Sequence, residues 1–239
     1  MADVLFVAAH PDDETLGMGV AIAEHIAAGH NVNVLIMSRS VGSGVLDQLN
    51  GSALSSWWGV IHNPSDEGYS PLTSEAFGIA RSNEAITALD CLATGLGTYT
   101  LFEGNLPEFT LTEAQDRILD VCTTISAGAV LLKGHSHLVD DHAEHVIVGN
   151  ALKNISLANP TLYGNRRHYI LPRYWTDSRL STVAEHWDLP TNAGISARAL
   201  NACRSYAAWA PPDSYAIGAH SVPDMWPVLM QAPKCMYHS

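Results

Sequence analysis

The chain has 239 residues, of which 47% are hydrophobic and 15% charged, a composition typical of one globular α/β domain with a substantial core. Its net charge of −12 argues against a nucleic acid gripped through its backbone, because phosphate contacts require a basic surface. No apolar run approaches the roughly 20 residues of a membrane span. The N-terminal residues resemble a strand and not a signal peptide, so we expect a cytoplasmic protein.

The first part of the chain predicts a β-α-β unit. Residues 3–8 form a continuous apolar run, typical of a parallel strand buried on both faces. Residues 15–28 carry apolar side chains at helical spacing and end before Gly29. Residues 32–37 read as the next strand. The following stretch, 40–75, is irregular and rich in Gly and Pro, and so long a loop is more often functional than idle.

The same alternation continues to about residue 155. The pattern predicts a helix over 75–93, a short strand over 98–102, a helix opening at a capping box of Thr112 and Gln115, a buried strand over 129–132 and a helix over 146–152. Beyond Tyr169 the pattern becomes irregular, and only one further helix, over about 196–208, is predicted.

Strands alternating with helices predict a Rossmann-like, mostly parallel β-sheet flanked by helices, with an irregular C-terminal third. Without repeats or linkers, residues 1–239 are taken as one domain, with a core over 3–155 and a substrate-specificity region over 156–239. In such folds binding sites form at the carboxyl ends of strands. The stretches AHPDDE (9–14) and HSHLVDDHAEH (135–145) both follow predicted strands, so we expect them to lie together.

These two stretches contain the residue types that hold a catalytic metal. Three carboxylates beside an imidazole repel one another unless a cation lies among them. A catalytic zinc ion takes three ligands from His, Asp, Glu or Cys and keeps one position open. The first stretch can supply His10 and Asp13, and the second offers four histidines, His135, His137, His142 and His145. The residues therefore predict a site for zinc or another divalent transition metal, with His135 and His137 expected as loop residues or as partners of a ligand.

The sequence resembles the PIG-L/LmbE-like N-acetyl-sugar deacetylases over roughly residues 3–155. Their first hallmark, A-H-P-D-D-E after the first strand, matches 9–14 at every position. Their second hallmark, His-x-Asp-His opening a helix, matches 142–145 with Glu144 in place of the usual Asp. A weaker hallmark, Arg-x-x-Glu-Ala, matches 81–85.

The resemblance implies a zinc-dependent hydrolase that removes an acetyl group from the amide nitrogen of an amino sugar or its conjugate. It implies His10, Asp13 and His145 as metal ligands. It also implies Asp12 as the general base and His142 as the general acid or stabiliser of the oxyanion.

The acidic residues of the second stretch are expected to orient its histidines. The resemblance implies that Glu144 orients His142, and we also assign Asp140 a supporting role. A competing register would make His142 the ligand. Its partner would then stand at position 139, which is Val139 and cannot bind a metal, so His145 is preferred.

Four residues are expected to contact the substrate. The resemblance places Arg81 at the site, and Glu108 falls where some relatives keep an acidic contact. Trp57 and Trp58 lie in the Gly-rich loop, where aromatic rings could stack on a sugar. The expected partner is therefore a small N-acylated sugar or sugar conjugate, and the oligomeric state is left open.

Three alternatives remain at this point. The enzyme could remove a longer acyl chain or act on a non-sugar amide, such as a glycosylated antibiotic or an amino acid conjugate. The chain could be a catalytically silent, metal-binding relative, although such a relative would be expected to lose the non-ligand Asp12. A nucleotide-binding module is disfavoured, because carboxylates after the first strand would repel a phosphate.

Overall fold

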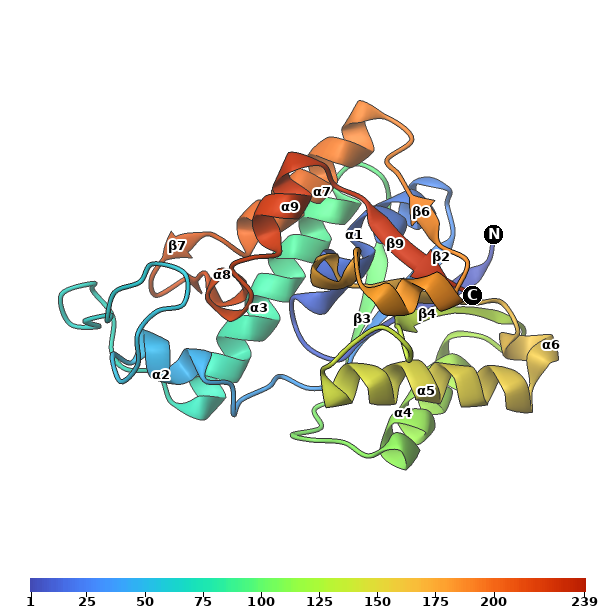
Figure 1. Cartoon of the computed structure of the whole chain (residues 1–239), viewed down its shortest axis with the longest axis horizontal. Coiled ribbons are helices and arrows are strands. Elements are labelled where there is room, and N and C mark those ends of the chain that lie inside the picture. The colour runs from blue at the N-terminus through green and yellow to red at the C-terminus, as the bar shows by residue number, and fades with distance from the viewer.

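A seven-stranded sheet forms the centre of the computed structural model, which describes residues 1–239 (Figure 1). Its strand order is β3-β2-β1-β4-β5-β9-β6, and all strands run in one direction except β9, which is antiparallel to both β5 and β6. The strands are β1 Asp3–Ala8, β2 Asn31–Ile36, β3 Tyr99–Glu103, β4 Val130–His135, β5 Arg166–Ile170, β6 His186–Asp188 and β9 Cys235–His238. A small separate hairpin is formed by β7 Trp209–Ala210 and β8 Ser214–Tyr215. The predicted mostly parallel α/β sheet is confirmed.

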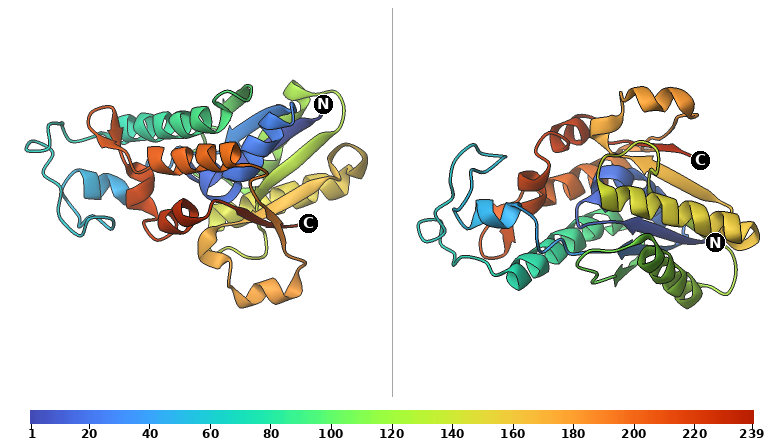
Figure 2. Two further views of the ribbon diagram at one scale, coloured as in Figure 1. Left: turned by 90° about the horizontal axis from the view of Figure 1, so that it is seen from above. Right: turned by 60° about the horizontal axis from the view of Figure 1, so that its bottom comes forward.

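Helices cover both faces of this sheet (Figure 2). The helices are α1 Asp13–Ala27, α2 Val45–Leu49, α3 Ser74–Ala93, α4 Leu111–Ile125, α5 Ala143–Ala158, α6 Pro160–Tyr163, α7 Ala193–Ser205, α8 Ile217–Ser221 and α9 Trp226–Gln231, with 3₁₀ turns at Pro172–Tyr174 and Ser178–Thr182. Helices α1, α3 and α7 pack together on one side, whereas α4 and α5 pack together on the other. None of these helices has the length and apolar character needed to cross a membrane.

Strand β1 shows why its sequence is apolar throughout. Val4 and Phe6 point into the larger hydrophobic cluster, under α1, and Leu5 and Val7 point into the second cluster, under α4 and α5. Successive side chains of a strand point to opposite faces, so a strand covered on both sides needs apolar residues at every position. The chain can then place polar residues only where β1 ends, which is where AHPDDE begins.

Two helix starts differ from the prediction. The capping box of α4 is formed by Thr110 and Glu113, two residues before the predicted pair: Thr110 Oγ1 accepts from Glu113 N at 3.3 Å and the Glu113 carboxylate accepts from Thr110 N at 2.8 Å. Helix α5 begins at Ala143, before the predicted 146, because His142 takes the N-cap position. His145 therefore lies on the first turn of a helix.

The C-terminal third is more regular than its sequence suggests. The predicted helix over 196–208 is Ala193–Ser205, and the final residues Cys235–His238 form β9 between β5 and β6. A strand of four residues leaves little periodicity to recognise, and its pairing partners are distant in sequence. The last strand of the chain thus extends the sheet beyond β5.

Candidate active site

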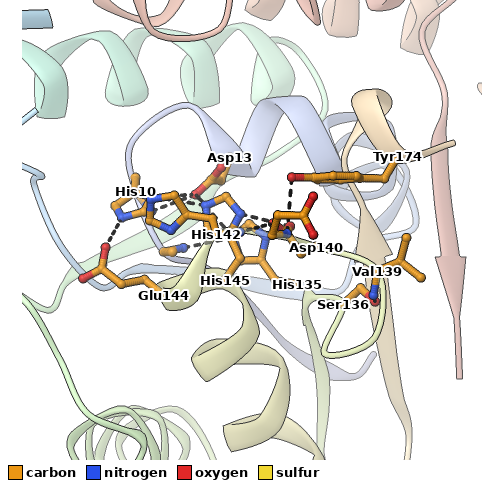
Figure 3. A network of polar contacts seen from close by, with 12 residues as sticks. His10, Asp13, His135, Ser136, Val139, Asp140, His142, Glu144, His145 and Tyr174 are labelled. Atoms are coloured by element: carbon orange, nitrogen blue, oxygen red, sulfur yellow. Dashed lines mark hydrogen bonds and ion pairs between the residues drawn. The ribbon is translucent and has the colours of Figure 1, made fainter. Parts of the chain in front are cut away.

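The two polar stretches meet at the carboxyl edge of the sheet. Strands β1 and β4 are parallel neighbours, with Val7 opposite Gly134, so the residues that follow them emerge side by side. The Ala9 backbone N–H donates to His135 Nε2 at 3.2 Å, which joins the two strand ends directly. Helix α5 starts a few residues later and returns His145 to the same point (Figure 3).

Three atoms from these stretches form an almost regular triangle. The distance from His10 Nδ1 to Asp13 Oδ2 is 3.4 Å, from Asp13 Oδ2 to His145 Nε2 is 3.3 Å, and from His145 Nε2 to His10 Nδ1 is 3.3 Å. Around a zinc ion at roughly 2.0–2.1 Å from each ligand, the edges of a tetrahedron measure roughly 3.3–3.4 Å. The spacing and the donor types therefore fit a divalent metal ion with one face open.

His135 and His142 flank this triangle. The His135 ring stacks on that of His145 with centroids 4.0 Å apart, and its Nε2 lies 3.3 Å from Asp13 Oδ2. His135 is buried, and its Nε2 already accepts the Ala9 N–H. His142 is exposed, with its ring centroid 4.8 Å from that of His10. Val139, the partner in the competing register, is buried in a separate hydrophobic cluster.

His10 and His145 each point one ring nitrogen toward the triangle, and a carboxylate lies against the other ring nitrogen of each. Asp140 Oδ2 lies 3.0 Å from His145 Nδ1, and Asp140 Oδ1 accepts from the His142 backbone N–H at 2.9 Å. Glu144 Oε2 lies 2.6 Å from His10 Nε2, so the carboxylate expected on His142 is on His10 instead (Figure 3). The difference has a geometric cause, since residues two apart in a helix point to different sides.

Burial and neighbouring charges shift the pKa values at this site strongly. Burial alone would lower the pKa of His145, but the carboxylates of Asp13 and Asp140 outweigh it and raise that pKa to about 10. Burial would raise the pKa of Asp13, but His145 and His135 bring it well below its usual value. Both shifts have the same cause, which is the close approach of His145 to the carboxylates of Asp13 and Asp140.

Asp12 lies beside the triangle without belonging to it. Its backbone has φ 119° and ψ −34°, a conformation that costs a non-glycine residue about 1–3 kcal/mol. The backbone N–H of Asp12 donates to Glu14 Oε2 at 3.0 Å, and its carboxylate accepts from Arg81 Nη2 at 3.2 Å. Arg81 also donates to the Pro11 carbonyl at 2.8 Å. Burial raises the pKa of Asp12 to about 7 against the opposing effect of Arg81, whereas a nearby metal ion would lower it.

A cavity of about 330 Å³ opens onto these residues. Its wall includes the six predicted residues of the two motifs that face the site, His10, Asp12, Asp13, His142, Glu144 and His145, together with Arg81, Glu108 and Asp140. The C-terminal third supplies Leu171, Arg173, Tyr174, Ser221, Val222 and Met225. The region taken as the specificity region thus contributes one wall of the cavity.

Trp57 and Trp58 do not line this cavity, contrary to expectation. Their rings stack on each other with centroids 5.1 Å apart, and Trp58 contacts Trp209 at 4.7 Å. His220, whose backbone belongs to α8, packs against both tryptophans at 5.4–5.5 Å. The pair therefore anchors the long loop to α8 instead of presenting a face to the cavity.

The sequence analysis expected His135 to be a loop residue or a partner of a ligand, and it assigned the C-terminal third to specificity without naming the residues of the wall. His135 could have been ranked higher, because it is the last residue of a buried strand next to β1, where site residues gather. Tyr174 and Met225 gave no such signal: they lie in short, irregular segments whose neighbours are set only by the folded chain.

Helix α5 must approach the end of β4 very closely at Gly149. A Cβ at this position would lie 2.6 Å from the His137 backbone nitrogen and 2.8 Å from the His135 carbonyl oxygen. We expect Gly149→Ala to displace α5, lower the free energy of unfolding by about 1–3 kcal/mol and weaken metal binding. Thermal unfolding and a metal titration would check this. Gly128→Ala, at an exposed loop where a Cβ meets only the Ser126 hydroxyl at 3.7 Å, is the control, and equal behaviour of the two variants would contradict the argument.

A family model decides the affiliation of the chain. The model of GlcNAc-PI de-N-acetylase, PIG-L, matches residues 5–156. The chain belongs to the PIG-L family. This confirms the resemblance that was inferred from the AHPDDE stretch. It also confirms, at the level of the family, that an N-deacetylase is the expected kind of enzyme. No match was found among curated proteins.

Solved structures with the same fold include members of more than one enzyme class. A mutant deacetylase of the teicoplanin biosynthetic pathway has 15% identity and a TM-score of 0.64, covering 99% of this chain and 97% of its own. The N,N′-diacetylchitobiose deacetylase from Pyrococcus horikoshii has 16% identity and a TM-score of 0.57, covering 96% and 78%. The 4-carboxy-2-hydroxymuconate hydratase from Pseudomonas putida KT2440 has 16% identity and a TM-score of 0.57, covering 100% and 95%. At such identities the likeness shows the fold and not the reaction.

Proposed function

We propose that this PIG-L protein is a zinc-dependent hydrolase that removes an acyl group, acetyl first of all, from the amide nitrogen of an amino sugar or its conjugate. The observation that carries the proposal is the triangle of His10, Asp13 and His145 atoms with the non-ligand carboxylate of Asp12 beside it. Family membership supports it, as do two deacetylases of the same fold, one from the teicoplanin biosynthetic pathway and one named for N,N′-diacetylchitobiose.

The residues of the chain suit the steps of amide hydrolysis. His10, Asp13 and His145 would hold the zinc ion, which supplies polarisation of the amide carbonyl and a lower pKa for water. Asp12 accepts the proton of the attacking water, and Arg81 keeps its carboxylate in place. His142, on the open side of the cavity, delivers a proton to the departing amine.

The lining of the cavity favours a small hydroxyl-rich ligand. The volume of the cavity, about 330 Å³, is near the lower end of the range for small-molecule sites. Ser40, Ser43 and the exposed Glu108 in the lining offer hydrogen bonds, whereas Leu171 and Met225 in the lining are apolar. A single sugar ring with a short acyl group fits such a mixed wall better than a long acyl chain does.

The test is zinc-dependent release of acetate. Purified protein is stripped with a chelator, reloaded with zinc and assayed on N-acetylated amino sugars, on their conjugates, on the same sugars with longer acyl chains and on N-acetylated amino acids. We expect acetate release from the sugar amides only with zinc bound. A zinc-loaded protein that releases no acid from any of these amides would refute the proposal.

A further inference from the structure

The carboxylate of Glu144 is committed to His10. Its Oε2 lies 2.6 Å from His10 Nε2, a distance typical of a short, charge-assisted hydrogen bond. Its Oε1 is buried and makes no hydrogen bond within the chain, so no other side chain competes for the group. The contact joins residues 134 positions apart, one on the turn after β1 and the other on the first turn of α5.

The two converging imidazoles are held in the same way. In His145, Nδ1 faces Asp140 Oδ2 and Nε2 faces the centre of the triangle. In His10 the two nitrogens exchange roles: Nε2 faces Glu144, and Nδ1 faces Asp13 and His145. A carboxylate on one imidazole nitrogen keeps the proton there and leaves the other nitrogen free to bind a metal. Asp140 and Glu144 thus have equivalent places on two different rings.

We propose that Glu144 is a positioning residue for His10, which sets the ring so that Nδ1 points to the metal position. The inference rests on the proposed function in that it takes His10 as a ligand. The other polar contacts of the His10 ring, with Asp13 and His145, lie on the metal side, so Glu144 alone holds the ring from behind. Without it, rotation of the ring would exchange the two nitrogens.

The length of the side chain at position 144 is then decisive. An aspartate on the same backbone is shorter by one methylene, about 1.5 Å, and its carboxylate would lose a hydrogen bond of 2.6 Å to His10 Nε2. A glutamine keeps the reach and can still accept from Nε2–H, although without charge. The reach of the glutamate side chain is therefore what brings its carboxylate to His10 Nε2.

The test compares zinc affinities, measured by competition with a chromophoric chelator, in Glu144→Gln, Glu144→Asp and Glu144→Ala. Removing the partner of a metal-binding histidine typically weakens binding about 10–100-fold. We expect Glu144→Asp and Glu144→Ala to weaken zinc binding by about this amount and Glu144→Gln to weaken it less. Asp140→Asn, which changes the carboxylate that faces His145, is the matched control. Thermal unfolding of the metal-free proteins shows that each variant is folded.

The ranking of the variants by zinc affinity decides whether the inference holds. If only the negative charge mattered, Glu144→Asp would bind zinc as the native protein does and Glu144→Gln would bind as weakly as Glu144→Ala, which would overturn the inference. Native affinity in all three Glu144 variants, with binding lost in His145→Ala, would overturn it as well. Native affinity in His145→Ala too would instead overturn the metal site of the proposed function.

Discussion

Replacing Asp12 with Asn is expected to lower kcat for acetate release by roughly 100- to 10,000-fold, the contribution typical of a general base. The zinc content should stay unchanged, because the Asp12 carboxylate bonds to Arg81 and none of its atoms belongs to the triangle of ligand atoms. Asparagine keeps the shape of the side chain and can still accept from Arg81, but it cannot take a proton from water. Steady-state kinetics and metal analysis of the same preparation measure both quantities.

The backbone at position 12 makes Asn the better variant. With φ at 119°, alanine would add strain of its own, whereas asparagine tolerates positive φ more readily. Asp12→Ala should therefore lose turnover as well, retain zinc and be less stable. Asp141→Asn serves as the control, because Asp141 is exposed and its side chain bonds to Arg179, outside the cavity. Native turnover in Asp12→Asn would remove Asp12 from the mechanism.

Replacing His145 with Ala is expected to abolish stoichiometric zinc binding, whereas His142→Ala should retain it. His145 Nε2 is one corner of the triangle, and its loss leaves only two ligands. The loss should exceed the roughly 10–100-fold effect of removing a partner of a ligand. His142 is exposed on the cavity wall, so its removal should lower kcat roughly 100- to 10,000-fold with the metal in place.

Zinc content after dialysis, measured by atomic emission on equal amounts of protein, distinguishes the two registers of the second motif. The reverse result, with zinc lost in His142→Ala and kept in His145→Ala, would make His142 the ligand. That register gains no second histidine from position 139, since Val139 is buried against Ile170 and Met236. Circular dichroism of both variants separates loss of a ligand from loss of the fold.

Much of this site could be anticipated because its signals are local. The apolar run of β1 ends at Ala8, and AHPDDE follows at once, so the strand, the turn and the start of α1 are all encoded in neighbouring residues. His142 and His145 likewise lie at the start of α5, which follows the end of β4 after a short loop. The alternation of strands and helices then implied a parallel sheet, whose carboxyl edge gathers such segments by geometry alone.

The folded chain alone revealed which side chains touch. The pairing of Glu144 with His10, the anchoring of Trp57 and Trp58 on α8 and the wall that includes Tyr174 and Met225 all join residues far apart in sequence. A motif states residue types and spacing, but the direction of a side chain follows from helix phase and from packing of distant segments. For this reason the sequence alone determined which residue types form the site. Which carboxylate holds which histidine was decided only by the folded structure.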